Sequence, residues 1–197
     1  MATRAKTRSD SNAGIFKWGT GGSLVAAAAA GAALAIAGNL GRKLAVQGLS
    51  ASTGEWDEAL AAEHEAVMAL FDRMLATDED NIRTRKMLLT QISHALDKHA
   101  YAEEHVVYAQ LRENGQQGFA EHLENDHGAV KEFLYRLMKM DAADPMWIET
   151  VRAFRDAVAL HAEEEEKEIF PALRAKLSDD QNAQLTKDVN KAGFWAA

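Results

Sequence analysis

The 197-residue sequence contains no cysteine and only two prolines. Without cysteine the chain has no disulfide, no thiolate metal site and no cysteine nucleophile, so any bound metal must take nitrogen and oxygen ligands. Proline breaks helices, and its scarcity, together with long runs of Ala, Leu, Glu, Lys and Met, favours an all-helical protein. The length suits one domain of ordinary size with a tail.

Concentrated positive charge is also missing. The net charge is −8, whereas the phosphate backbone of a nucleic acid requires a concentrated basic face. The small basic group of Arg83, Arg85 and Lys86 is expected on the solvated surface. We therefore expect no nucleic-acid partner.

The N-terminal part of the chain differs in composition from the rest. Residues 1–22 are rich in Thr, Ser, Arg, Lys and Gly, which predicts a disordered polar tail. Residues 23–48 form an Ala/Gly-rich hydrophobic segment, and its most apolar part, residues 23–40, is just long enough to span a membrane. Its few large aliphatic residues contribute only about −0.3 to −0.6 kcal/mol each to insertion, so the sum is marginal.

Three interpretations of residues 23–40 stay open. The segment is a membrane anchor, or a helix that packs in solution or self-associates through Ala27, Gly31 and Ala35, or a signal peptide with an A-x-A-like cleavage site before Gly38. Basic residues flank both ends, so the positive-inside rule gives no orientation. We expect a cytoplasmic or membrane-associated protein, with a periplasmic location as the remaining option.

From Ser52 onward the hydrophobic pattern has a helical period, with Ser52 or Thr53 as the first N-cap. Long helices are predicted over 55–76, 81–113, 119–140 and 145–176. Ser178 begins a capping box for a short closing helix. Short connections between long helices imply antiparallel neighbours. The predicted fold is all-α, an up-down antiparallel four-helix bundle over residues 52–178, with a short C-terminal helix and tail over residues 179–197.

The two halves of this domain repeat each other. Residues 63–75 (EHEAVMALFDRML) align with residues 126–138 (DHGAVKEFLYRLM), at an offset of 63 residues. Residues 99–111 (HAYAEEHVVYAQL) align with residues 161–173 (HAEEEEKEIFPAL), at an offset of 62 residues. The bundle is therefore predicted to consist of two similar helical hairpins that present equivalent side chains to its centre.

Polar residues interrupt the apolar seam of every predicted helix. They are His64, His99, Glu103, His127, His161 and Glu165. The spacing of four in each His-x-x-x-Glu motif places the histidine beside its glutamate on one helix face. Because a buried polar group without a partner costs about 1–3 kcal/mol, these six residues need a common partner. A pair of divalent or trivalent cations meets that need, since imidazole and carboxylate are both good ligands.

Neighbouring polar residues have other interpretations. Glu104 and Glu166 are runner-up ligands, because a slight helix rotation would bring either one inward. Five residues fall outside the seams and are expected on the solvated surface: His94, His105, His122, Glu163 and Glu164.

The chain has a histidine on one predicted helix and a His-x-x-x-Glu motif on the next, and this pattern occurs twice. In this it resembles the hemerythrin-like (HHE) cation-binding family. The resemblance covers about residues 55–176 and includes the Phe170-Pro171 ending of the second copy. It departs from oxygen-carrying hemerythrins at their fifth histidine, because Leu123 stands four residues before His127.

This resemblance implies a non-heme centre of two iron ions with an oxo or hydroxo bridge, which reacts with or senses O2, peroxide or nitric oxide. Zinc and manganese are less favoured occupants of the same ligands. Four histidines instead of five leave an open position on each iron, which favours redox removal of peroxide or nitric oxide, as in a stress response, over reversible oxygen binding. The alternatives are iron sensing or storage, and an interaction protein that the metal only stabilises. No side chain is assigned as a general acid or base.

Overall fold

The computed structural model describes residues 54–196. The predicted polar tail (1–22), the Ala/Gly-rich segment (23–48) and the predicted caps Ser52 and Thr53 lie outside the described residues. None of the described helices is long and apolar enough to cross a membrane. Residues 23–40 are not among these helices, so the three interpretations of that segment stay predictions, as do the domain boundaries.

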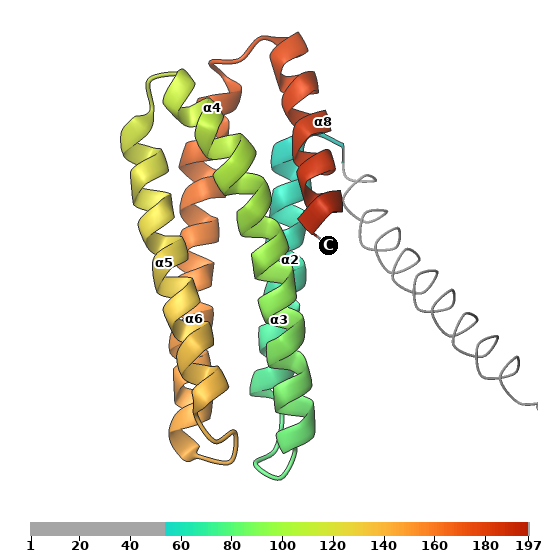
Figure 1. Cartoon of the computed structure of the whole chain (residues 1–197), viewed down its shortest axis with the longest axis vertical. Coiled ribbons are helices and arrows are strands. Elements are labelled where there is room, and N and C mark those ends of the chain that lie inside the picture. The colour runs from blue at the N-terminus through green and yellow to red at the C-terminus, as the bar shows by residue number, and fades with distance from the viewer. Residues whose placement is uncertain (1–53, 197) are drawn as a thin grey trace, which may run out of the picture. The chain divides into compact units, whose positions relative to one another are not determined.

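Within residues 54–196, four long helical segments run alternately up and down and a fifth helix follows them (Figure 1). In chain order they are α2 (Trp56–Leu75); α3 (Ile82–Ala102) continued by the π-helical turn η1 (Glu103–Val107) and α4 (Tyr108–Glu113); α5 (Gln117–Lys139); α6 (Pro145–Glu164) continued by the π-helical turn η2 (Glu165–Ile169) and α7 (Phe170–Arg174); and α8 (Asp179–Ala196). The predicted all-α, up-down bundle is confirmed.

The long helices pair as two hairpins. The first hairpin joins α2 to α3–η1–α4, and the second joins α5 to α6–η2–α7. Contacts between α2 and α6 and between α3 and α5 close the two hairpins into a bundle. Helix α8 then folds back against α3, η1 and α2, while α5 and α6 lie on the side away from it (Figure 1). The first hairpin is therefore covered by an additional helix.

Local sequence signals mark the helix ends. Asp144 caps α6, with its carboxylate accepting a hydrogen bond from the Met146 N–H at 2.8 Å. Ser178 and Gln181 form the predicted capping box, in which each side chain accepts from the backbone N–H of the other, at 3.3 and 2.9 Å. Gly115 follows α4 with a φ of 75°, a conformation that favours glycine.

Two expectations for the first hairpin are wrong. The N-cap of α2 is Glu55 instead of Ser52 or Thr53. Arg85, expected on the solvated surface, is buried, and its guanidinium donates to the Ala142 carbonyl oxygen at 2.7 Å. An arginine is tolerated there because its donors find acceptors in both turns at this end of the bundle.

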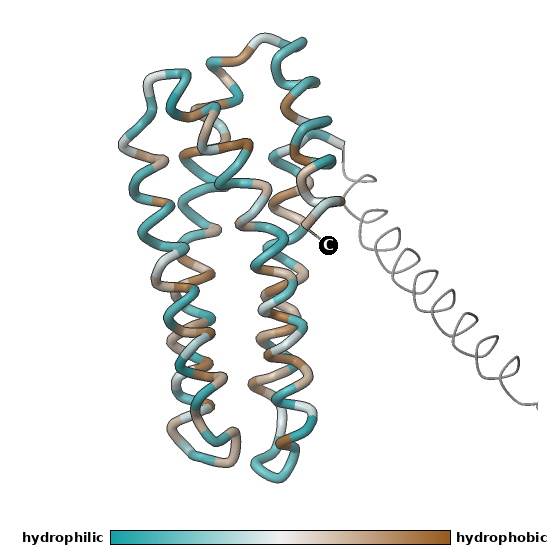
Figure 2. The backbone as a smooth tube through the Cα atoms, in the orientation of Figure 1, coloured by the Kyte–Doolittle hydropathy of each residue, from teal (hydrophilic) through white to brown (hydrophobic). Residues whose placement is uncertain are grey.

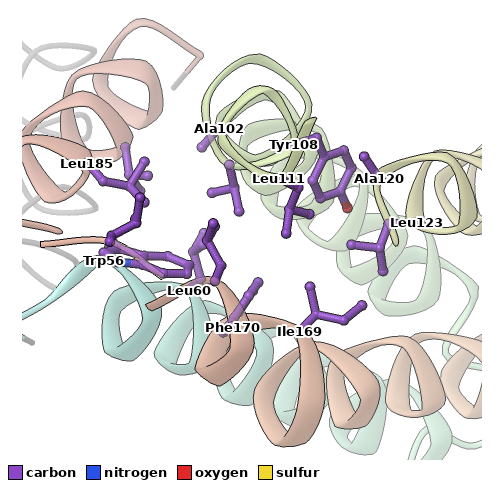
Figure 3. Packing of buried hydrophobic residues seen from close by; sticks show 14 of the residues in the cluster. Trp56, Leu60, Ala102, Tyr108, Leu111, Ala120, Leu123, Ile169, Phe170 and Leu185 are labelled. Atoms are coloured by element: carbon purple, nitrogen blue, oxygen red, sulfur yellow. The ribbon is translucent and has the colours of Figure 1, made fainter. Parts of the chain in front are cut away.

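Two apolar clusters fill the bundle, with a polar layer between them. The first cluster joins α8 to the hairpins, and Figure 3 shows Trp56 beside Leu60 and Leu185. The second cluster fills the other end of the bundle. On α2, His64 lies between Leu60 of the first cluster and Val67 of the second. Along each helix, hydrophilic and hydrophobic residues alternate as in an amphipathic helix (Figure 2).

A π-helical turn begins at the glutamate of each His-x-x-x-Glu motif, Glu103 in η1 and Glu165 in η2. Such a turn holds more residues than an α-helical turn, so the apolar seam shifts by one position beyond it. Val107 is fully buried, whereas Val106, which the 3.6-residue period placed on the seam, is only half-buried. Single π-helical turns of this kind are frequent at functional sites.

Candidate metal centre

The polar layer brings all six sequence-predicted residues together. Their exposed fractions are His64 4%, His99 3%, Glu103 0%, His127 4%, His161 6% and Glu165 0%. Their candidate ligand atoms form two groups, each with all atoms within 4.8 Å of one another. The groups are His64, His99, Glu103 and Glu165, and Glu103, His127 and His161. Glu103 belongs to both, so the groups adjoin at the centre of the bundle.

Each buried glutamate faces one histidine from each hairpin. Oε1 of Glu103 lies 3.0 Å from Nε2 of His99, in the first hairpin. Oε2 of Glu103 lies 3.3 Å from Nε2 of His127, in the second hairpin. Glu165 repeats the arrangement, because its Oε2 lies 3.4 Å from Nε2 of both remaining histidines. All four Nε2 atoms therefore converge on two carboxylates that lie between the hairpins.

A second layer of carboxylates faces the outer nitrogen, Nδ1, of every histidine. The pairs are His64–Glu166 at 2.8 Å, His99–Glu63 at 3.2 Å, His127–Glu104 at 3.0 Å and His161–Asp126 at 3.5 Å. A carboxylate that accepts the Nδ1 proton fixes the tautomer and leaves the Nε2 lone pair available to a metal. The arrangement is typical of histidines that bind metals.

This outer layer changes the interpretation of four acidic residues. Glu104 and Glu166, the runner-up ligands, lie at the outer nitrogens of histidines. Glu63 and Asp126 were missed. A signal for them was present, because each directly precedes the first histidine of its copy, just as Glu104 and Glu166 directly follow the glutamates of the two motifs.

Within residues 54–196, several buried polar atoms at the centre have no hydrogen-bond partner, which indicates whether the six His and Glu residues fit a metal. Among the described residues, buried atoms without a hydrogen-bond partner include both oxygens of Glu103, Oε2 of Glu165 and Nε2 of His64, His99 and His161. Such atoms are costly in a protein interior and require an explanation. Because all of them are good ligands for a metal and all converge, the residues fit a pair of cations.

The two glutamates and their histidines are electrostatically linked. Burial opposes the charge on Glu103, but His99 and His127 outweigh it and hold the pKa of Glu103 well below its usual value. Burial and the charge of Glu103 together raise the pKa of Glu165. Burial lowers the pKa of His99, but Glu103 and Glu63 outweigh this and hold it well above its usual value. A metal that binds here must therefore displace protons.

Tyr108 also reaches the centre. Its hydroxyl donates to Oε1 of Glu165 at 3.2 Å and lies 3.2 Å from Nε2 of His127. Burial raises the pKa of this hydroxyl, and Glu103 and Glu165 raise it further, so the phenol stays protonated. The matching position in the second copy is Phe170, also buried (Figure 3). The alignment of the two copies could have indicated Tyr108, because only the first copy has a hydroxyl at this position.

The three remaining histidines lie where the sequence predicts. His94, His105 and His122 are exposed. Leu123, which stands where oxygen carriers have a fifth histidine, is a fully buried apolar residue of the first cluster. Among residues 54–196, the centre therefore contains four histidines.

Comparison with known proteins gives one family and two relatives. The family described as "Hemerythrin HHE cation binding domain" matches residues 57–173. A DNA nickase of Nostoc sp. is 26% identical over 135 residues, which cover 68% of this chain and 38% of that protein. An uncharacterized hemerythrin-like protein of Schizosaccharomyces pombe is 24% identical over 137 residues, covering 68% of this chain and 66% of that protein. The chain thus spans less than two thirds of either relative, and no solved structure is significantly similar to it.

Proposed function

This chain belongs to the hemerythrin HHE cation-binding domain family, and we propose that its six buried His and Glu residues hold two iron ions. One observation carries the proposal: two groups of ligand atoms adjoin through Glu103. Each group supplies imidazole nitrogens and carboxylate oxygens but no sulfur, a donor set that suits iron.

The residues divide naturally between two ions. Glu103 and Glu165 would each join both ions, since each faces a histidine of either hairpin. Each histidine would bind one ion through Nε2. The carboxylates hydrogen-bonded to Nδ1 of His64, His99 and His127 would hold these imidazoles in orientation and raise their basicity. Two anionic glutamates taken out of water are then balanced by the cations.

For the reaction we propose redox removal of peroxide or nitric oxide. Bound iron supplies a change of oxidation state and Lewis acidity. The chain contributes the rest: the Tyr108 hydroxyl presents a proton at Oη towards Glu165, and apolar clusters on both sides of the polar layer exclude water. Leu123 in place of a fifth histidine supports a reaction over reversible oxygen binding.

Sensing or storage of iron is the second candidate, together with a structural role for the metal. The unsatisfied buried atoms support it, because any cation that satisfies them also stabilises the bundle. DNA cleavage is not proposed: the nickase relative is matched over 38% of its length, and the net charge of −8 does not favour a nucleic-acid partner.

The metal content of the purified chain tests the centre. We expect about two irons per chain, the number that the two ligand groups suit, and loss of both in a His99→Ala, His161→Ala variant. A matched variant, His94→Ala, His105→Ala, removes two exposed histidines and should keep both irons. Equal metal content in the two variants, or none in the unchanged protein, would contradict the proposal.

The type of reaction needs a second assay. The iron-loaded chain is mixed with an excess of peroxide or nitric oxide and an electron donor, and consumption is followed over time. Consumption in large excess over the protein supports a redox enzyme. Uptake that stops at one equivalent supports sensing and contradicts an enzymatic role.

A further inference from the structure

A separate cluster of metal-binding side chains lies on the second hairpin, outside the polar layer. His122 and Asp126 lie one turn apart on α5, and Glu164 is the last residue of α6. His122 Nε2 lies 3.0 Å from Glu164 Oε2 and 3.7 Å from Asp126 Oδ2, and the ligand atoms of all three lie within 4.8 Å of one another. Glu164, expected to be solvated, is in fact half-buried.

This cluster is open to solvent. The side chains of His122, Asp126 and Glu164 are 50%, 35% and 29% exposed. His122 and Glu164 also line an open surface hollow together with Gly118 and Phe119. A hydrated cation can therefore reach the three side chains without any movement of the backbone.

The cluster is also connected to the buried centre, through His161. Nδ1 of His161 has no hydrogen-bond partner among the described residues, although His161 is only 6% exposed. This unsatisfied nitrogen lies 3.5 Å from Asp126 Oδ2, while Nε2 of the same ring lies 3.4 Å from Glu165. One imidazole thus separates the surface cluster from the centre, with a nitrogen facing each.

The first hairpin has no such cluster at the matching positions. Ala59, Glu63 and Ala102 correspond to His122, Asp126 and Glu164.

Both alanines are 2% exposed, and α8 covers them. The pocket that remains there, lined by Ala59, Glu63, Ala102 and Val189, measures about 10 Å³, which is close to the space of one water molecule. The second hairpin therefore presents three side chains that could hold a cation, whereas α8 covers the matching face of the first hairpin.

We propose that His122, Asp126 and Glu164 form a surface site for a divalent cation, from which the ion passes by way of Asp126 and His161 to the buried centre. The surface site is independent of the proposed function, whereas the loading role rests on it. One imidazole and two carboxylates are suitable ligands for Fe2+, Zn2+ or Co2+. Three protein ligands at an exposed position bind more weakly than the buried set, as a loading site must.

Co2+ is the probe that tests this site on the full, metal-free chain. Calorimetric titration should show the tight binding of the centre and one further, weaker equivalent. A His122→Ala, Glu164→Ala variant should lose the weaker equivalent and keep the tight ones. The control variant, His94→Ala, Glu163→Ala, makes the same change of charge with two other exposed side chains and should behave as the unchanged chain does.

The loading role is tested by the rate at which the Co2+ absorption of the centre appears in stopped flow. At limiting metal, loss of the surface site should slow loading about tenfold, the lower range for a local charge that concentrates an ion. Unchanged stoichiometry and rate in the His122→Ala, Glu164→Ala variant would overturn the proposal, and loss of the weak equivalent at an unchanged rate would overturn the loading role. If the centre itself takes no metal, the proposed function fails, yet the weak equivalent still reports on the surface site.

Discussion

The two hairpins share a sequence pattern but not an environment. In the first, α8 covers the outer face, Trp56 is fully buried, and Glu63 is held between His99 and Lys98. In the second, the corresponding Phe119 is half-buried and Asp126 is part of an exposed cluster. The repeat keeps the same histidines and glutamates facing the centre, whereas the faces that point outward differ.

This divergence suggests a division of roles. Helix α8 shields the histidines of the covered hairpin from solvent, and the open hairpin is proposed to give the centre access to ions. Burial opposes the charge on Glu63, but His99 and Lys98 outweigh it and lower its pKa to about 2, so this outer partner stays ionised near neutral pH. Each of the following predictions compares a residue of the covered hairpin with a counterpart elsewhere.

The largest effect is expected at Trp56. Its indole N–H donates to Asn182 Oδ1 of α8 at 3.1 Å, and its ring packs against Phe170 of α7, so Trp56→Ala removes a large buried side chain that joins α8 to the bundle. We expect the free energy of unfolding of the metal-free protein to fall by about 3–5 kcal/mol, measured with urea. Phe119→Ala, at the matching position of the open hairpin, should cost less than half as much. Equal losses would show that α8 does not distinguish the hairpins.

A smaller effect is expected at the outer carboxylates. Glu63→Gln removes the negative charge that faces His99 Nδ1 and that pairs with the ammonium of the buried Lys98. We expect the equilibrium affinity for the metal to fall about 10- to 100-fold, the usual cost of losing such a partner.

Asp126→Asn is the comparison for that change. Asp126 lies farther from its histidine, at 3.5 Å, and is partly exposed, so water can replace it and the affinity should fall less. Both affinities can be measured by competition with a chelator. A larger loss in Asp126→Asn would reverse the proposed roles of the two hairpins.

The smallest effect is expected at Tyr108. Tyr108→Phe makes the two hairpins alike at this position and removes one buried hydrogen bond to Glu165, for a loss of about 0.5–1.5 kcal/mol of stability. With iron bound, the two ions should become more similar in Mössbauer spectra. Tyr135→Phe, which alters an exposed tyrosine, should change neither quantity. Unchanged spectra in Tyr108→Phe would place the hydroxyl outside the influence of the metals.

The sequence predicted the bundle and all six residues of the polar layer, because a histidine or glutamate in an apolar seam is visible to simple periodicity. Tyr108 was missed since the π-helical turn shifts the seam by one residue at Val107, and a 3.6-residue period has no means of indicating that turn. Whether the polar layer binds metal stays a prediction.

The packing of α8 on the first hairpin could also not be predicted from the sequence. Leu185 and Val189 show that one face of α8 is buried, but the same apolar face fits either hairpin. Glu104 and Glu166 illustrate a further limit. Each directly follows a glutamate of the polar layer, and a small helix rotation decides whether its carboxylate points to the centre or to the outer nitrogen of a histidine.

The most direct test of the account is anomalous diffraction from crystals of the iron-loaded chain. We expect two iron peaks in the polar layer, both bound by Glu103 and Glu165 and each by two histidines through Nε2. A single peak, or iron bound through Nδ1 or through Glu104 and Glu166, would contradict the ligand set on which the proposed function depends.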